Sequence, residues 1–582
     1  MEEAPSTDDT VEASHDDIAV APSVSTRRNS AVVAAGIFLS RISGLVREGT
    51  ISHFFGLGFA ADAFSAAFRI PNLMQNLLGE GVLSASFIPV YSRLLAEGRE
   101  EEAGRVAGAT AGLLTALAGG LVLVGVVFAR PITAVLAPGL APATFALTVR
   151  LTRIITPGIG FLVLSAWCLG VLNSHRRFFM SYVAPVLWNG AQIGVLVALG
   201  ATVYAEALGT GLEARSAEIA LVTALAWGTV LGGALQFLVQ LPWVLRVARG
   251  VRPSLRTDLP GVRQVARAFA PVVGGRGVVQ LSAYADQFLA SFLAVGALAA
   301  LRFSQTLYVL PISLFGMAVA AAELPEVSSM QSDSREQLRS RLNEGLGRIA
   351  VFVVPTVVGF LAIGDLIVGA LYQRGQFDRT DSLQVWVVLA GYAVGLIASA
   401  SSRLLQSALY GTGDPRTPAK VAALRVVASV ALGVGLMFQL DRVSITTGQL
   451  SVVGDLPAFG PVPDEVRQPD ASEQVARLGA AGLSLAAGVT AWLEWRLLRR
   501  TIRDRVGDVR LAGGQLPAML VAAAGGLVVA LAIRPLVAGL PMLAAAPIAV
   551  AATGVTYLAV AYALGIPEVR KLTRRAIRII RR

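Results

Sequence analysis

Lysine and charged residues in general are scarce in this sequence, and each shortage excludes a class of function. Charged residues make up 15% of the 582 residues, against about 25% in soluble globular chains. The two lysines, Lys420 and Lys571, do not follow glycine. The chain therefore has no Gly-Lys-Ser/Thr of a Walker A loop, which excludes ATP-powered transport encoded in this chain.

Cysteine and histidine are also too few for disulfide or zinc chemistry. The single cysteine, Cys168, lies in an apolar run, allows no intrachain disulfide and is interpreted as a packing residue. The three histidines lie far apart in the sequence, and the His-Glu-x-x-His, Gly-x-Ser-x-Gly and Ser-x-x-Lys signatures are missing. We therefore expect no enzymatic activity and no cofactor.

Long apolar runs are abundant instead. The mean hydropathy is +0.65, and runs of ~20 apolar residues, each long enough to cross a bilayer, recur from Ala31 to Leu564. The pattern predicts an all-α polytopic membrane protein with about fourteen transmembrane helices. The predicted starts are Ala31, Ala60, Gly104, Thr144, Tyr182, Ala217, Val265, Leu298, Gly347, Ser382, Pro418, Ala476, Leu516 and Pro541.

Basic residues are distributed unevenly over the predicted loops. Most lie in the N-terminal tail and the even-numbered loops, as in 246–263, 496–510 and 570–582. The positive-inside rule then predicts that both termini are cytoplasmic and that the number of spans is even. The long external loop, residues 439–475, has no apolar periodicity and is predicted to be a flexible connector, whereas the basic C-terminus is expected to lie along anionic headgroups.

A weak internal repeat at an offset of about 240 residues pairs Arg69-Ile-Pro71 with Val309-Leu-Pro311. It predicts two six-helix lobes in a pseudo-twofold arrangement, with a cavity between them and two further helices at the C-terminus. The predicted division is a disordered N-tail (1–30), an N-lobe (31–250), a C-lobe (251–500), and the last two helices with a basic tail (501–582).

Polar residues form a continuous stripe on each of the first two helices. The residues recur at intervals of three or four: Gly36, Ser40, Ser43, Gly44 and Arg47, with Arg41 adjacent, and then Asp62, Ser65, Arg69, Asn72, Asn76 and Glu80. Ionisable groups in a membrane cost ~2.5–3.5 kcal/mol each. The stripes are either structural ion pairs or an anion site. Several arginines favour a site for a phosphorylated amphiphile or other anion, because the guanidinium fork binds phosphate oxygens.

The second lobe has fainter stripes of its own. Arg276 shares a face with Tyr284 and Gln287, with Asp286 beside it, and Arg403 begins a similar face at Gln406 and Tyr410. Core packing and substrate contact both remain open for these residues. Arg302, at the start of the eighth helix, is expected to snorkel to the outer surface.

Ordered motifs from the first helix onward resemble the MurJ (MviN) lipid II flippases of the MOP exporter superfamily. They include Ser40-Arg41-Ile-Ser-Gly44-Leu-Val-Arg47-Glu48, Asp62-Ala-Phe64, Phe68-Arg69-Ile-Pro71-Asn72, Glu80-Gly81, Leu136-Ala-Pro138-Gly139, Gln240-Leu-Pro242 and Leu310-Pro311. The resemblance implies a flippase of the bacterial inner membrane that moves lipid II, an undecaprenyl-pyrophosphate-linked peptidoglycan precursor, to the outer leaflet by alternating access. Arginines matching Arg41, Arg47 and Arg69 line the family's cationic cavity, and carboxylates matching Asp62 and Glu80 are also functional.

The resemblance further implies that the last two helices form a groove for the lipid tail. Cell-wall synthesis proteins are additional candidate partners, and no nucleic acid is expected. We expect the membrane potential or an ion gradient to drive transport, with Asp62, Glu80 and Asp286 as candidates to carry a coupling cation.

One departure concerns the eighth helix, where many members of the family carry Ala-Asp-Arg and this chain has Ser304-Gln305-Thr306. We hypothesise that Arg276 supplies the missing second-lobe cation. The alternatives are another MOP exporter, either a polyprenyl-linked polysaccharide flippase or a drug/cation antiporter, and a scaffold that binds lipid II without moving it. A polytopic glycosyl- or acyltransferase is disfavoured because no loop gathers catalytic residues.

Overall fold

The computed structural model describes residues 24–207, 211–317, 319, 335–446, 449–467 and 475–580. Residues 1–23 of the predicted N-tail (1–30) lie outside the described structure. Helix α1 begins at Val24, ahead of the predicted start at Ala31, because the helix continues beyond the apolar run that hydropathy detects.

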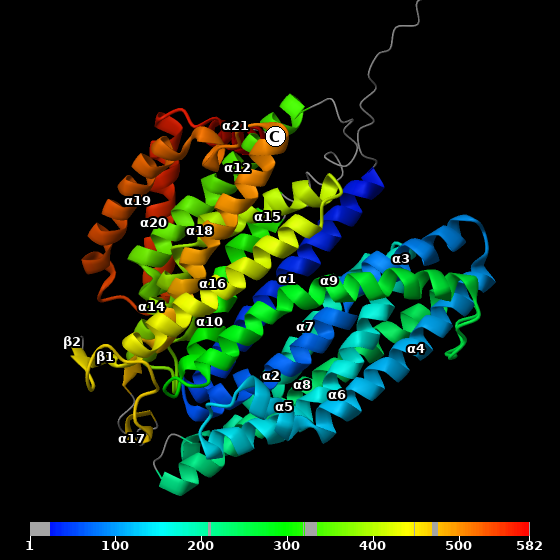
Figure 1. Ribbon diagram of the computed structural model, residues 1–582, viewed down its shortest axis with the longest axis horizontal. Helices are drawn as coiled ribbons and strands as arrows, with labels where there is room; N and C mark the ends of the chain where they lie inside the picture. The colour runs from blue at the N-terminus through cyan, green and yellow to red at the C-terminus, as the bar shows by residue number, and fades with distance from the viewer. Residues whose placement is uncertain are drawn as a thin grey trace, which may run out of the picture.

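The helices form two lobes with corresponding packing (Figure 1). The first comprises α1 (Val24–Phe55), α2 (Phe59–Leu78), α3 (Glu80–Ala96), α4 (Glu100–Val127), α5 (Ala129–Leu136), α6 (Pro142–Ser174), α7 (Phe178–Ala207) and α8 (Gly211–Val247). The second comprises α9 (Pro260–Ala290), α10 (Ala297–Pro311) with its continuation η1 (Ile312–Met317), α12 (Arg335–Ala362), α13 (Gly364–Tyr372), α14 (Arg379–Ala393), α15 (Leu396–Gly411), α16 (Arg416–Asp441) and α18 (Gly479–Val506).

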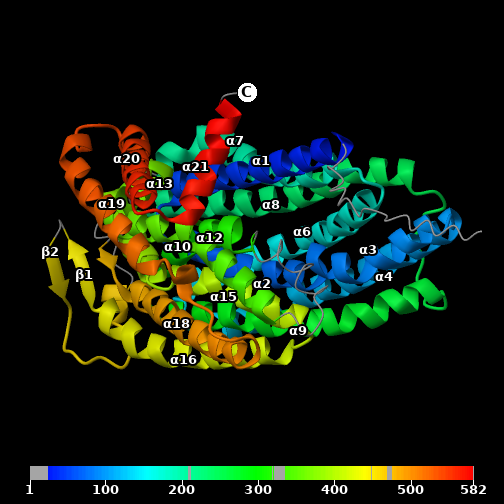
Figure 2. The same cartoon turned by 90° about the horizontal axis from the view of Figure 1, so that it is seen from above.

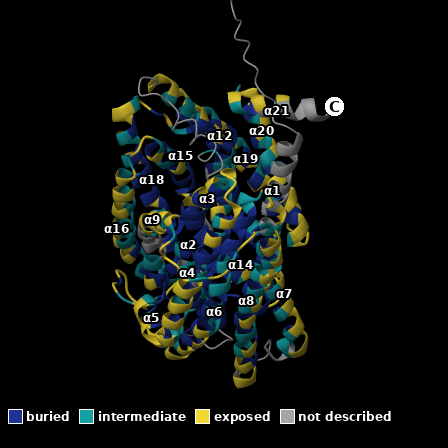
Figure 3. Ribbon diagram, turned by 90° about the vertical axis from the view of Figure 1, so that its right-hand side faces the viewer, coloured by how far each residue is buried: buried dark blue, intermediate teal, exposed yellow. Residues whose placement is uncertain are grey.

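The internal repeat is visible in the neighbours of each helix. In the first lobe α7 packs on α8, α6 on α8, and α1 on α7; in the second, α16 packs on α18, α14 and α15 on α18, and α9 on α16. The lobes meet where α9 packs against α2 and α3, where α10 packs against α2, and where α1 packs against α13. Exposed residues concentrate on the outer faces of helices such as α7 and α16 (Figure 3).

Nine helices of the described chain are long and apolar enough to cross a membrane, or ten if α14 and α15, bent by 46°, count as one span. The predicted number of about fourteen is therefore not confirmed. Helices α1, α2, α9 and α18 have at least 20 residues each but are not among the nine. Their polar and charged residues, several of them buried inside the protein, lower the mean hydropathy of these helices below that of a typical membrane span.

The external loop 439–475 is more ordered than predicted. Strand β1 (Val443–Thr446) pairs antiparallel with β2 (Gln449–Val452; Figure 2) and with β3 (Ala476–Arg477). A turn of helix, α17 (Asp464–Arg467), follows β2 in the chain (Figure 1). Arg467 donates to the carbonyls of Ser291 and Leu293 at 2.8 and 3.2 Å. The loop is thus anchored by contacts distant in sequence, which periodicity does not reveal; residues 447–448 and 468–474 lie outside the described structure.

The C-terminal segment forms a helical hairpin on the second lobe, ending in a basic helix. It consists of η3 (Leu511–Gly514), α19 (Leu516–Val537), α20 (Met542–Ala563) and α21 (Pro567–Ile580), and it packs on α12 and α13. Arg534 of α19 donates to both carboxylate oxygens of Asp365 on α13, at 3.0 and 2.7 Å. This bidentate pair attaches the hairpin to the lobe.

Replacing Arg534 with alanine is expected to destabilise the protein by about 2–3 kcal/mol, because it leaves the buried Asp365 carboxylate without its partner. The measurement is thermal unfolding of the purified chain. Arg256→Gln is the control, since it breaks an exposed pair with Asp258 and should change stability by less than ~1 kcal/mol. Equal melting temperatures for the two variants would show that the pair does not hold the hairpin.

Candidate functional site

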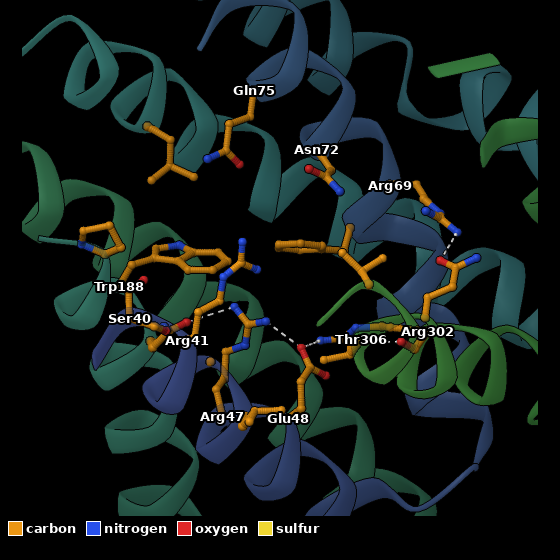
Figure 4. Close-up of a pocket in the computed structure, with 18 of the residues that line it drawn as sticks. Ser40, Arg41, Arg47, Glu48, Arg69, Asn72, Gln75, Trp188, Arg302 and Thr306 are labelled. Carbon is orange, nitrogen blue, oxygen red and sulfur yellow. Dashed lines mark hydrogen bonds and ion pairs between the residues drawn. The ribbon is translucent and has the colours of Figure 1, made fainter. Parts of the chain in front are cut away.

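A polar chamber of about 760 Å³ lies between the lobes (Figure 4). Helices α1, α2 and α10 supply its charged residues, and α6, α7, α8 and α9 supply further lining residues. The charged residues in its lining are Arg41, Arg47, Glu48, Arg69 and Arg302. Four guanidinium groups and one carboxylate leave the chamber with a formal charge of +3, which favours an anionic ligand.

The lining of the chamber contains a carboxylate shared by two arginines from different lobes. Glu48 Oε1 accepts from Arg47 Nη2 of α1 at 2.5 Å and from Arg302 Nη2 of α10 at 3.0 Å. The Glu48 side chain is only 3% exposed. Arg47 also donates to Asn189 Oδ1 at 3.0 Å and lies over the Trp188 ring at 4.8 Å. The network therefore joins the lobes through charge.

Arg302 does not snorkel to the outer surface, contrary to the sequence-based expectation. Its guanidinium lies 4.9 and 5.9 Å from the rings of Phe64 and Phe68 and points into the chamber (Figure 4). The reason is that α10 packs on α2, which covers this face of the helix. A sequence signal was available, since Arg302, Gln305 and Thr306 follow one another at helical spacing and all three line the chamber.

The other two chamber arginines, Arg41 and Arg69, form no ion pair with a carboxylate in the part of the chain that the structure describes. Arg69 Nη2 donates to Gln305 Oε1 of the second lobe at 3.2 Å, and Gln305 in turn donates to Tyr392. Among the described residues, Arg41 has neither a hydrogen bond nor an ion pair, and it is exposed in the chamber. Their charges are thus available to a ligand.

The structure brings together some of the predicted site residues. Ser40, Arg41, Arg47, Arg69 and Asn72 line the chamber. Asn76 does not line it but donates to Asn72 Oδ1 at 3.3 Å.

The remaining predicted residues are placed elsewhere or lie outside the described side chains. Arg403 is exposed, bonds to Gln406 and does not line the chamber, and the half-buried Asp286 does not line it either. The side chains of Glu80 and Arg276 are outside the described part of the structure. The idea that Arg276 replaces a missing cation therefore stays a hypothesis, although Arg302 already supplies a second-lobe arginine.

Asp62 lies beyond the chamber, where the lobes are sealed. Its two carboxylate oxygens accept from the backbone N–H groups of Gly296, at 2.7 Å, and Ala299, at 2.8 Å, at the start of α10. A carboxylate at a helix N-terminus satisfies free donors and the helix dipole. Gly296 has φ 91°, and a Cβ there would be 2.7 Å from the carbonyl oxygen of Leu57. Glycine is therefore required for this close approach.

Several neutral chamber residues were not predicted. Trp188, Asn189, Gln236 and Ser165 line it from three helices. Asn189 holds α7 to α1 by donating to Ser43 Oγ at 2.8 Å, and Gln236 donates to Ser165 Oγ at 3.0 Å. Single amides in apolar helices carry little signal, because a stripe becomes visible only when several polar residues share one face.

Two lobes of corresponding helices around a central chamber are also the fold of solved transporters of the MOP superfamily. A solved structure of a multidrug resistance MATE family transporter of the MOP superfamily, inward-facing, superimposes with a TM-score of 0.56 at 17% identity, covering 82% of this chain and 98% of that one. A solved lipid II flippase MurJ in an inward closed conformation superimposes with a TM-score of 0.68 at 19% identity, covering 91% of this chain and 98% of that one.

Sequence comparison is more specific than the fold. A family profile described as lipid II flippase MurJ matches residues 51–454. The lipid II flippase MurJ of Burkholderia cenocepacia is 29% identical over 81% of this chain and 83% of its own length. A probable lipid II flippase MurJ of Rhizobium tropici is 30% identical over 68% of this chain and 72% of its own length. The chain belongs to the MurJ family of lipid II flippases.

Proposed function

We propose that this chain moves lipid II from the cytoplasmic to the outer leaflet by alternating access, with its pyrophosphate held in the chamber. One observation carries this proposal: four arginines from both lobes converge on one chamber with a single carboxylate. The sugar and peptide head occupies the polar space while the polyprenyl tail stays in lipid. The role is transport rather than catalysis.

The arrangement of the arginines suits pyrophosphate binding followed by a change of conformation. Arg41 and Arg69, which form no ion pair with a described carboxylate, attract the anion first. Arg47 and Arg302 then exchange the shared Glu48 oxygen for phosphate oxygens, because a guanidinium binds two oxygens of a phosphate at once. Those two arginines belong to different lobes. When both bind one ligand, the relative free energy of the inward-open and outward-open conformations changes.

The proposed orientation places both termini in the cytoplasm, following the distribution of basic loops. The chamber then faces the cytoplasm and is sealed on the outer side. The outer seal comprises the Asp62 contacts with α10, the hydrogen bond from Ser52 Oγ to the Tyr372 carbonyl at 3.1 Å, and that from the Gln376 N–H to the His53 carbonyl at 2.9 Å. The chamber can open to the outer side only when all three of these sets of contacts break.

The energy source is proposed to be the membrane potential or an ion gradient. An inside-negative potential assists outward movement of negative cargo by ~2.3 kcal/mol per charge per 100 mV. Asp286, Asp62 and Glu80 remain candidates for carrying a coupling cation during the return of the empty protein. Cell-wall synthesis proteins that use the delivered precursor are candidate partners.

The test is to express the chain in bacteria depleted of their own lipid II flippase and to measure how much lipid II an external degrading toxin can reach. We expect accessibility to return to the level before depletion. Accessibility of a cytoplasmic-leaflet aminophospholipid is the control, since a non-selective scramblase would raise both. A well-inserted chain that binds lipid II without restoring accessibility would be a scaffold, and the proposed function would be wrong.

A further inference from the structure

A second cavity of about 760 Å³ lies on the other side of α1 from the chamber. It is bounded by α1, α7, α13 and α20, and we call it the seam groove because it follows the line where the lobes meet. Its lining is Ile42, Leu45, Val46, Gly49, Thr50, His53, Phe54, Val197, Gly200, Ala201, Tyr204, Ala370, Leu371, Arg374 and Leu543. Leu45 lines both cavities, so α1 alone separates them at this point.

The seam groove is apolar along most of its length and polar at one end. Val46, Val197 and Leu543 are 52%, 54% and 62% exposed, although they belong to three different helices that meet there. The polar end is closed by the Tyr204 hydroxyl, which donates to the His53 carbonyl at 3.0 Å. Large exposed apolar side chains around a concavity mark a site for an apolar ligand.

A cation without an acidic partner lies at the polar end. Arg374 lies just beyond the end of α13 and is exposed, and its Nη2 donates at 3.0 Å to the carbonyl of Ala370, four residues earlier. Among the described residues it forms no ion pair with a carboxylate. Its other donors are therefore available to an anionic group at the mouth of an apolar groove.

The length of the groove matches one leaflet of a bilayer. Along α1 its lining runs from Ile42 to Phe54, which at 1.5 Å per residue is roughly 18 Å. The hydrocarbon core of a bilayer is ~30 Å thick, so the groove spans about half of it. Arg374 then lies where the phosphate of a lipid in that leaflet would be.

From this match we infer that the seam groove binds an anionic phospholipid, with its acyl chain in the groove and its phosphate on Arg374. The bound lipid fills the space between the first lobe and the C-terminal helices. Its assignment to the outer leaflet rests on the orientation proposed above. Lipid binding itself depends on neither that orientation nor transport of lipid II.

The test is native mass spectrometry of the purified full chain in detergent, titrated with phosphatidylglycerol or phosphatidylcholine. We expect one phosphatidylglycerol to bind more tightly than phosphatidylcholine. Arg374→Gln should weaken that preference about fivefold, as expected for one basic residue at an anionic lipid. Ala201→Trp, which fills the groove, should remove the bound lipid.

Two variants serve as matched controls. Arg379→Gln removes an exposed arginine nearby in the chain, and Thr202→Trp adds the same bulk to an exposed position of α7 next to Ala201; neither residue lines the groove. Both should bind phosphatidylglycerol like the native chain. The inference is overturned if Arg374→Gln and Ala201→Trp also bind it like the native chain. It is equally overturned if the molecule displaced by Ala201→Trp is polyprenyl-linked, which would make the groove a site for the cargo's tail.

Discussion

Replacing Arg302 with glutamine is expected to reduce lipid II translocation by about 30-fold or more at equal membrane abundance. The variant removes the second-lobe cation of the chamber and leaves Glu48, which is only 3% exposed, paired with Arg47 alone. Truncating one member of a buried charge pair costs 2 kcal/mol or more, and here the same group is proposed to hold pyrophosphate. Access of an external toxin to lipid II in flippase-depleted cells measures the loss.

Arg403→Gln is the matched control for this experiment. The sequence pattern left both core packing and substrate contact open for Arg403, but the structure leaves it exposed and outside the chamber. Translocation by this variant should stay within about twofold of the native level. If Arg302→Gln were as active as Arg403→Gln, pyrophosphate would not be held between the two lobes as proposed.

Glu48→Gln should separate binding of lipid II from its movement. The substitution raises the formal charge of the chamber from +3 to +4 and removes the carboxylate that competes with phosphate for Arg47 and Arg302. We expect lipid II to bind about tenfold more tightly, because hydrogen bonds to charged groups are worth ~1.5–3 kcal/mol. Translocation should fall at least about tenfold, since the empty chamber can no longer neutralise two facing arginines and close.

The two effects require two measurements, lipid II binding to the purified chain and toxin accessibility in cells. Glu494→Gln is the control, because Glu494 is also a buried carboxylate paired with an arginine, Arg425, but does not line the chamber. It should lower stability without tightening lipid II binding. Weaker binding by Glu48→Gln would mean that Glu48 orients the arginines for the ligand rather than competing with it.

Much of the architecture was accessible from local sequence patterns. Apolar runs of ~20 residues predicted the membrane helices, and the repeat predicted two lobes, because helix length and duplication are properties of the chain itself. The count of about fourteen spans is not confirmed, since helices such as α1 and α9 bury polar residues within the protein. The loop 439–475 was predicted wrongly as a flexible connector, because its order depends on Arg467 reaching Ser291 and Leu293.

For the candidate site, the sequence by itself determined that the first two helices present arginines on one protected face, because helical periodicity places Arg47 and Arg69 on polar stripes. Only the tertiary structure decided that Arg302 completes the chamber, that Glu48 is shared by both lobes, and that Asp62 caps α10 beyond the chamber. Glu48 and Arg302 are 254 residues apart in the chain. Their pairing depends on how α1 and α10 are placed relative to each other in the folded protein. Periodicity within a single helix contains no information about that placement.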